Sequence, residues 1–177
     1  MQIAMNFPDI ETSRLRLRAI SARDWHTIFS YMSDSRVTAF LPQGTLDKEA
    51  SRAFALKHSG NEGEAVAVVE KASGQMIGHM PFHAWYVPAT FEIGWVISPR
   101  YQELGYATEA ARALMDFAFN TLRCHRVVAT CQPENTASWK IMEKLSMRRE
   151  AHFRQALLQK NGAWWDEYFY ALLADEY

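Results

Sequence analysis

The sequence predicts an α/β (α+β) fold in which helices flank a mixed central sheet. Several segments alternate apolar and polar residues with the period of two that is typical of half-buried strands. Others carry apolar residues at helical spacing, and the two kinds of segment succeed one another along the chain. With 177 residues and 49% apolar composition the chain can bury a sizeable core, and we expect one domain over residues 1–177.

The first half of the chain predicts three strands and two helices. Arg14 to Ile20 alternates leucine and alanine with arginine, which indicates a strand with one solvated basic face. Helices are expected from Ser21 to Met32 and from Asp47 to His58. Ala65 to Glu70 and Met76 to Trp85 indicate two strands that pair antiparallel.

The middle of the chain predicts a strand, a helix and a second strand. Thr90 to Ser98 alternates in the manner of one continuous strand, and Pro99 ends it. A helical stripe runs from Ala107 to Leu122, and the nearly continuous apolar segment Arg126 to Cys131 is typical of a strand covered on both faces. If the two strands are parallel, their connection should be a right-handed crossover.

The last third of the chain predicts a helix and a hairpin. Asn135 is a natural N-cap for a helix that opens at Pro133. Glu150 to Leu158 and Trp165 to Leu172 flank Asn161-Gly162, a dipeptide that accepts positive φ and favours a hairpin turn. We expect the chain to end in paired strands.

Composition restricts the class of function. The 19 basic and 20 acidic residues leave a formal charge of −1, which gives no general attraction to nucleic acid or to an anionic membrane. Cys124 and Cys131 cannot form a secreted disulfide framework, and neither a signal peptide nor a membrane-length apolar run is evident. We therefore expect a cytoplasmic protein that binds any anion by local geometry.

The most informative segment leads from a strand through a short loop into a helix, Ile97 to Ala110. Gly105 and Ala107 remove side-chain bulk where the helix begins. The free N–H groups and the positive end of the helix dipole at that point suit a phosphate or pyrophosphate. On this feature alone, a plain structural turn is the commoner explanation.

Five motifs together resemble one family. Gln102-Glu103-Leu104-Gly105-Tyr106-Ala107 is similar to the Gln/Arg-x-x-Gly-x-Gly/Ala pyrophosphate loop of the GCN5-related N-acetyltransferases (GNAT), which bind acetyl-CoA. Its Tyr-Ala-Thr-Glu-Ala continuation resembles the branch of ribosomal-protein N-terminal acetyltransferases (RimJ/RimL-like). The other matching segments, in the order of the family, are Glu11 to Arg18, Pro133 to Ser138, Met142 to Met147 and the Asn161-Gly162 hairpin.

The resemblance implies a twisted sheet whose strands Thr90 to Ser98 and Arg126 to Cys131 splay apart, with pantetheine in the gap. The backbone near Ile97 would hold the pantetheine arm, the loop would bind pyrophosphate, and Asn135 would contact the thioester. The implied cofactor-binding residues are Ile97, Gln102, Leu104, Gly105, Tyr106, Ala107, Thr108 and Asn135.

The chemistry implied is direct attack of a neutral amine on the acetyl carbonyl, helped by positioning. Glu92 is the candidate for taking the amine proton through water, and Ser138 for contacting or protonating the thiolate. Glu92 as an ordinary solvated strand residue, and Ser138 as part of a helix start, are the competing interpretations. Near Leu157, we expect the hairpin to offer no carboxylate base.

Other conspicuous residues give weaker evidence for a functional site. In a strand His79 and His83 are about 13 Å apart, too far to grip one metal ion, so no metal is expected. Cys124 or Cys131 as an acyl-carrying nucleophile is less favoured than a buried apolar role. Aromatic residues of the last hairpin, Trp164, Trp165, Tyr168 and Tyr170, either line an acceptor pocket or pack in the core.

The sequence departs from the family pattern in the loop and after the fourth helix. Glu103 and Leu104 stand where glycine and a polar or basic residue are usual. Ser146 replaces a glycine at a position expected to need positive φ.

We interpret the chain as an acetyl-CoA-dependent N-acetyltransferase that acts on a protein N-terminal α-amine or a small amine. A non-catalytic CoA-binding regulatory module of the same fold is the alternative. The expected partners are acetyl-CoA and the amine acceptor, without nucleic acid or membrane, and a homodimer is compatible with the sequence.

Overall fold

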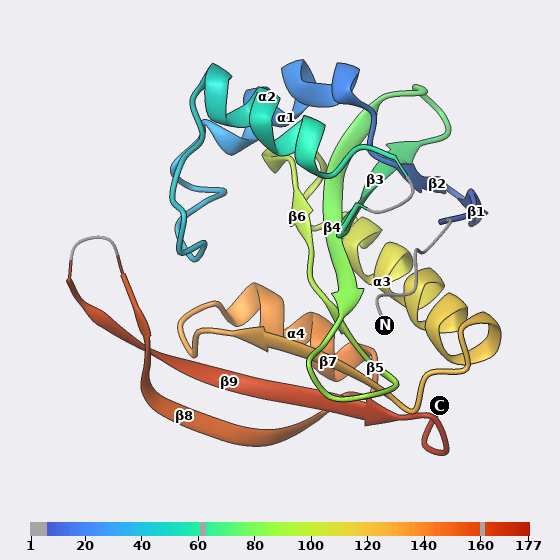
Figure 1. Cartoon of the computed structure of the whole chain (residues 1–177), viewed down its shortest axis with the longest axis vertical. Coiled ribbons are helices and arrows are strands. Elements are labelled where there is room, and N and C mark those ends of the chain that lie inside the picture. The colour runs from blue at the N-terminus through green and yellow to red at the C-terminus, as the bar shows by residue number, and fades with distance from the viewer. Residues whose placement is uncertain (1–6, 61–62, 160–161) are drawn as a thin grey trace.

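The computed structural model describes residues 7–60, 63–159 and 162–177. Its strands form a nine-stranded sheet in the order β1-β2-β3-β4-β5-β7-β9-β8, with β6 paired to β4 beside this path (Figure 1). They are β1 (Ile10–Glu11), β2 (Leu15–Ala19), β3 (Ala65–Glu70), β4 (Met76–Ala84), β5 (Thr90–Ile93), β6 (Val96–Ile97), β7 (Arg126–Cys131), β8 (Arg148–Leu158) and β9 (Trp164–Leu173). Neighbours pair antiparallel except β5 and β7, which are parallel, so the expected mixed sheet is confirmed.

Two of the described helices begin directly after a residue whose side chain caps them. The helices are α1 (Trp25–Met32), α2 (Lys48–Lys57), α3 (Tyr106–Asp116) and α4 (Thr136–Lys144), with the short turns η1 (Ala22–Asp24), η2 (Pro99–Tyr101) and the π-helical η3 (Phe117–Thr121). The Asp47 carboxylate accepts the Ala50 N–H at 2.8 Å, and the Asn135 side chain accepts the Ser138 N–H at 3.3 Å. These bonds satisfy N–H groups that have no acceptor inside the helix.

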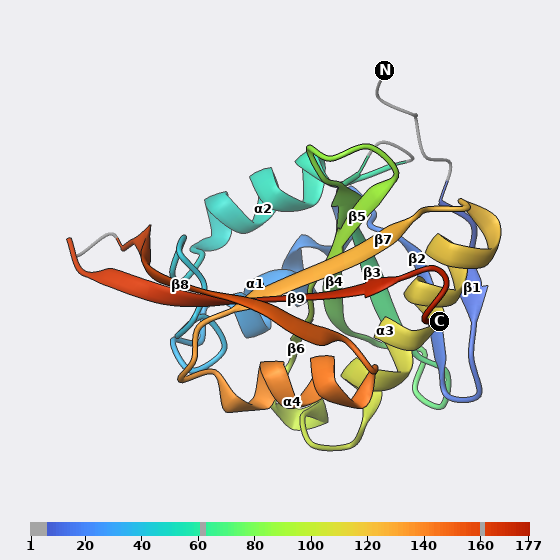
Figure 2. The same ribbon diagram turned by 90° about the horizontal axis from the view of Figure 1, so that it is seen from below.

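The two faces of the sheet pack against different helices. On β3, Val66 and Val68 join the core that contains residues of α3 and α4, whereas Ala67 and Val69 join the core that contains residues of α1 and α2. Successive side chains of a strand point to opposite faces, which is why this short apolar strand supplies both cores. Figures 1 and 2 accordingly show α1 and α2 on one side of β3 and β4, and α3 on the other.

The predicted continuous strand from Thr90 to Ser98 is wrong, because the chain leaves the strand path at Gly94 and Trp95. β5 pairs with both β4 and β7, but β6 pairs only with β4. The Gly94 N–H donates to the Pro81 carbonyl at 3.0 Å. A Cβ atom on Gly78 would lie 2.2 Å from the Val96 carbonyl oxygen, so only a glycine admits β6 this close to β4.

This break produces the expected splay. β6 stays with β4, while β7 continues alongside β9 as far as Cys131, paired with Tyr168. β5 and β7 are paired, but beyond β5 the chain continues as β6, which is not paired with β7. The two strands β6 and β7 therefore separate.

The last two strands form a long hairpin that projects past the helices (Figures 1 and 2). Its pairing shifts between Phe153 and Leu157, where Gln155 has φ +48° and its N–H donates to the Asp166 carboxylate at 2.8 Å. The predicted Asn161-Gly162 turn lies partly outside the described residues, since the structure describes Gly162, with φ +83°, but not Asn161.

Candidate functional site

The loop before α3 has the backbone geometry of an anion site. Gly105 occupies the N-cap with φ +82°, a left-handed conformation that glycine adopts without steric cost. A Cβ atom at Gly105 would meet one described atom, Nη2 of Arg14 at 3.4 Å. The first N–H groups of a helix, here those of Tyr106, Ala107 and Thr108, have no acceptor inside the helix, and Gly105 has no side chain to cap them. This cradle fits a phosphate group.

Side chains brace the loop on both sides. The Gln102 amide Nε2 donates to the Ile97 carbonyl at 2.8 Å, which ties the loop back to β6. Arg14 Nη1 donates to the Leu104 carbonyl at 3.0 Å, while the Leu104 side chain itself is exposed. The structure thus brings the predicted residues Ile97, Gln102 and Leu104 together, and Gln102 acts on the shape of the loop through Ile97.

Glu109 joins two motifs that lie far apart in the sequence. Its carboxylate accepts the Thr12 hydroxyl at 2.6 Å, the Ser13 hydroxyl at 3.1 Å and the Arg14 Nε at 2.6 Å. Burial alone would raise the pKa of Glu109, but these hydrogen bonds outweigh burial and lower it. The carboxylate is therefore ionised and paired, and it fixes the start of β2 against the first turn of α3.

The remaining loop residues divide between packing and exposure. The Tyr106 hydroxyl donates to Glu70 at 2.5 Å, and the Arg14 guanidinium lies 4.4 Å from the centre of the Tyr106 ring. Thr108 and Gly105 line a groove of about 680 Å³ that continues along α3 to Arg112. Of the loop residues from Gln102 to Thr108, Gly105 and Thr108 are therefore the two that reach the groove.

Ser138 and Asn135 meet at the point where β7 ends and α4 begins. Besides the N-cap bond from Asn135, the Ser138 side chain hydrogen-bonds the thiol of Cys131. Burial raises the pKa of Cys131 to about 11, although the bond to Ser138 opposes the shift, and burial likewise raises the pKa of Cys124 to about 11. Thiolates are scarce at neutral pH with such values, which disfavours a cysteine nucleophile.

Glu92 is held by a partner rather than freely solvated. It stands opposite His83 in the β4–β5 ladder, and its Oε2 lies 3.4 Å from His83 Nε2. The hydrogen bond that His83 donates to the Glu92 carboxylate raises the pKa of His83. His79, four residues before His83, is instead buried and hydrogen-bonded to the Tyr31 hydroxyl at 2.8 Å. Burial lowers the pKa of His79 to about 3.

The two histidines therefore have separate partners, Tyr31 for His79 and Glu92 for His83. Within the described ranges, no three His, Cys, Asp or Glu side chains gather closely enough to hold a metal ion.

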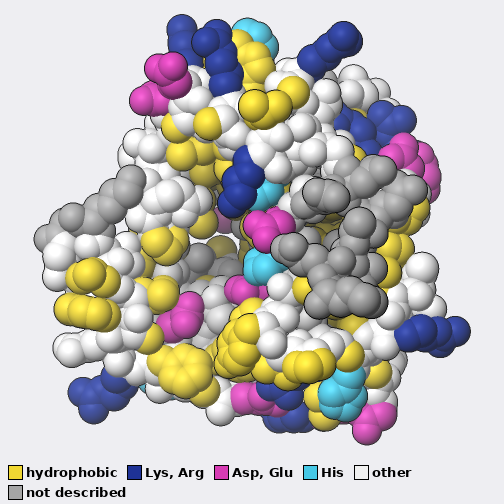
Figure 3. Space-filling view, in the orientation of Figure 1, with side chains coloured by type: hydrophobic (Ala, Val, Ile, Leu, Met, Phe, Trp, Pro, Cys, Tyr) yellow, Lys and Arg dark blue, Asp and Glu magenta, His cyan; other side chains and the backbone are white. Residues whose placement is uncertain are grey.

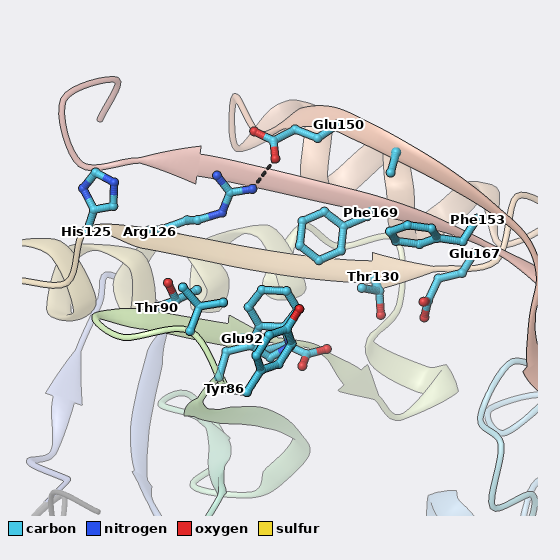
Figure 4. Close-up of a pocket in the computed structure, with 13 residues that line it drawn as sticks. Tyr86, Thr90, Glu92, His125, Arg126, Thr130, Glu150, Phe153, Glu167 and Phe169 are labelled. Carbon is cyan, nitrogen blue, oxygen red and sulfur yellow. Dashed lines mark hydrogen bonds and ion pairs between the residues drawn. The ribbon is translucent and has the colours of Figure 1, made fainter. Parts of the chain in front are cut away.

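Glu92 also lines a cavity of about 770 Å³ on the face of β5, β7 and β9 that is turned away from α3 (Figure 4). The cavity shows that one sequence expectation is wrong, because the last hairpin does supply a carboxylate. Glu167 of β9 lines the same cavity and hydrogen-bonds Thr130 of β7. Burial raises the pKa of Glu167, and the nearby charge of Glu92 adds to that rise.

A sequence signal for Glu167 exists. In the period of two along β9, Glu167 shares a face with Trp165 and Phe169, so the strand carries one charge on an otherwise apolar face. Of the hairpin aromatics, Tyr170 packs in the core, Trp164 is exposed, and Trp165 lies 6.3 Å from the Phe40 ring centre.

Residues 14–148 match the model of a protein family described as "Acetyltransferase (GNAT) domain". The chain belongs to the GNAT acetyltransferase family. The uncharacterized N-acetyltransferase YnaD of Bacillus subtilis is 41% identical over 168 residues, which cover 95% of this chain and 98% of YnaD. The crystal structure of a GNAT acetyltransferase from Bacillus anthracis superimposes with a TM-score of 0.90 at 40% identity, covering 96% and 100% of the two chains.

A more distant neighbour carries ligands. Spermidine N-acetyltransferase from Vibrio cholerae, in complex with CoA and spermine, superimposes with a TM-score of 0.80 at 20% identity, covering 93% of this chain and 98% of that one. At this identity the likeness is one of fold. The GNAT family uses acetyl-CoA, and the Gly105 cradle of this GNAT chain fits its pyrophosphate. Among the described residues, no helix is long and apolar enough to span a bilayer.

Proposed function

We propose that this GNAT protein transfers an acetyl group from acetyl-CoA directly to a primary amine, either a protein N-terminal α-amine or a small amine. The observation that carries the proposal is the braced Gly105 cradle at the start of α3, beside the gap between β6 and β7. We further propose that it is a cytoplasmic acetyltransferase domain over residues 1–177, of the RimJ/RimL-like branch that its motifs resemble.

The proposed donor site runs along this gap. The backbone of Ile97 on β6 holds the pantetheine arm, and the loop from Gln102 to Thr108 binds the pyrophosphate through its N–H groups. Asn135, at the far side of the gap, contacts the thioester end. Its Oδ1 already accepts from the Ser138 N–H, so its amide Nδ2 is the group left to donate.

In the proposed reaction the amine nitrogen bonds to the acetyl carbon and the carbon–sulfur bond breaks. Glu92 accepts the amine proton through water, and the His83 partner orients that carboxylate. The Ser138 hydroxyl donates to the departing thiolate. Because Cys131 and Cys124 are held as thiols, no acyl-cysteine step is needed.

Acceptor screening by thiol release tests the proposal, with acetyl-CoA as donor. We expect at least one amine to release CoA, and Glu92→Gln and Ser138→Ala each to lower kcat by about 10²-fold with little change in CoA affinity. Cys124→Ser is the control that should remain active. Binding of CoA without thiol release from any amine would instead favour the non-catalytic module.

Calorimetry tests the cradle separately. Gly105→Val should abolish CoA binding, because a branched side chain would fill the space where phosphate meets the N–H groups. The matched control is Gly74→Val, since Gly74 also has positive φ, +67°, but lies in the β3–β4 turn. Equal CoA affinity in both variants would remove the donor site from this loop.

A further inference from the structure

Glu167 differs from the other carboxylates of the Figure 4 cavity because no described Lys, Arg or His side chain forms an ion pair with it. Glu92 is paired with His83, and Glu150 forms an ion pair with Arg126. The Glu167 carboxylate instead accepts a hydrogen bond from the neutral Thr130 hydroxyl.

The position of Glu167 is electrostatically unfavourable in the free protein. Figure 4 shows its carboxylate and the Thr130 hydroxyl extending from β9 and β7 toward the side of the cavity that holds Glu92. Partial burial and the charge of Glu92 both disfavour a second anion there. A cation between the two carboxylates would relieve this repulsion. Unsatisfied charges in a cavity are typical of ligand sites.

The wall of the cavity is aromatic. Phe169 is buried, and its ring centre lies 5.4 Å from that of Trp85 and 6.1 Å from that of Phe153. Phe153 is 46% exposed, so its ring is open to a ligand. Aromatic faces attract cations and also cover apolar groups. In the space-filling view, acidic and histidine side chains line the middle of the same face, next to hydrophobic ones (Figure 3).

We propose that Glu167, together with Glu92, binds the acceptor as a primary ammonium attached to an apolar or aromatic body, and excludes amines that carry a carboxylate next to the nitrogen. The inference rests on the proposed function and names the acceptor class for it. A carboxylate beside the amine would add a third anion near two others. The cavity offers it no free guanidinium, because Glu150 already holds Arg126.

The ammonium must lose its proton before attack. The proton passes to Glu92 through water, the nitrogen then bonds to the acetyl carbon, and the thiolate leaves. Glu167 remains the anion that holds the acceptor, and it is a specificity residue of this site.

Matched pairs of acceptors test the inference. We expect thiol release from acetyl-CoA to give kcat/KM at least about tenfold higher for 2-phenylethylamine than for phenylalanine, and for tyramine than for tyrosine. Glu167→Gln should reduce this preference several-fold. Glu49→Gln, which removes the same charge from the exposed start of α2, is the control and should keep it.

A thermal measurement without acetyl-CoA makes the test independent of turnover. Glu167→Gln should raise the Tm of the free protein, because it removes the repulsion, and 2-phenylethylamine should raise the Tm of the wild type but not of Glu167→Gln. Equal kcat/KM within each pair, or a preference that Glu167→Gln leaves unchanged, overturns the inference while acetyl transfer stands. If no amine releases thiol, the proposed function is contradicted. The Tm shift with 2-phenylethylamine then tests separately whether Glu167 binds an amine.

Discussion

Glu103 brings both backbone strain and a negative charge to the phosphate loop, and two different substitutions can separate their effects. It has φ +62° in the phosphate loop, a conformation that costs a residue other than glycine roughly 1–2 kcal/mol. Glycine avoids this strain but loses about 0.5–1 kcal/mol in chain entropy. The net effect of Glu103→Gly is therefore about 0–1.5 kcal/mol of added stability. In a domain of this size that corresponds to a Tm increase of up to roughly 6 °C.

The charge of Glu103 acts on binding instead. No ion pair in the described part of the chain includes Glu103, so no described cation offsets its charge. A surface charge at a helix start contributes about 0.3–1 kcal/mol, which predicts CoA binding about 1.7- to 5-fold tighter in Glu103→Gln. Glutamine keeps the strained backbone, so its Tm should stay close to that of the wild type.

Calorimetric titration with CoA at low and high salt, together with thermal unfolding, measures both effects. The gain in affinity should shrink at high salt because mobile ions screen the charge. Glu134→Gly is the control for the glycine variant, since Glu134 is exposed with ordinary φ and should lose stability on substitution. If Glu103→Gln binds CoA no more tightly at low salt, the electrostatic reasoning is wrong. If Glu103→Gly does not exceed Glu134→Gly in Tm, the strain argument fails as well.

Two further predictions concern stability. Ser146 has φ +63° at the end of α4, where the Met147 N–H donates to the Met142 carbonyl at 3.0 Å, so Ser146→Gly should raise the Tm by roughly 2 °C while Ser35→Gly should not. Thermal unfolding of both variants checks this, and equal shifts would contradict it. Glu92 raises the pKa of His83, so the pair stabilises the fold below the unfolded-state value of about 6.5 and loses this effect as pH rises through the folded-state pKa. His83→Gln should therefore lower the Tm more at pH 5.5 than at pH 9, and a pH-independent difference would refute the assignment.

Local patterns predicted most of the fold because they report burial directly. The alternation in β2 and the cap at Asn135 depend on neighbours within a few residues, and the structure has them where the sequence predicts. The prediction failed at Thr90 to Ser98 for the same reason. Trp95 still packs against the core beyond the bend, so the alternation continues while the pairing partner changes. Periodicity records which side is buried and not which strand lies next to it.

The candidate site likewise has one part that the local sequence predicts and one part that depends on how the strands pair. The Gly105 loop is contiguous in the sequence, so its geometry could be predicted from one segment. Glu167 joins Glu92 only because β5 pairs with β7 and β7 pairs with β9, with Thr130 opposite Phe169. That register depends on tertiary packing. The charge on the apolar face of β9 is the local sign of this register, and it indicates a partly buried acid without identifying its neighbour.

Arg14 links β2 to the start of α3, and this link explains how a chain with a net charge of −1 can offer an anion site there. The first turn of that helix is acidic, because it contains Glu109. Glu109 would repel phosphate if its charge were free. Arg14 instead lies between this carboxylate and the loop, bonded to Glu109 at 2.6 Å and to the Leu104 carbonyl at 3.0 Å. The guanidinium neutralises the acid, fixes the loop backbone and places a positive group within reach of Gly105. The β2 motif and the loop motif thus form one unit, in which a pair of opposite charges orders the backbone of the loop.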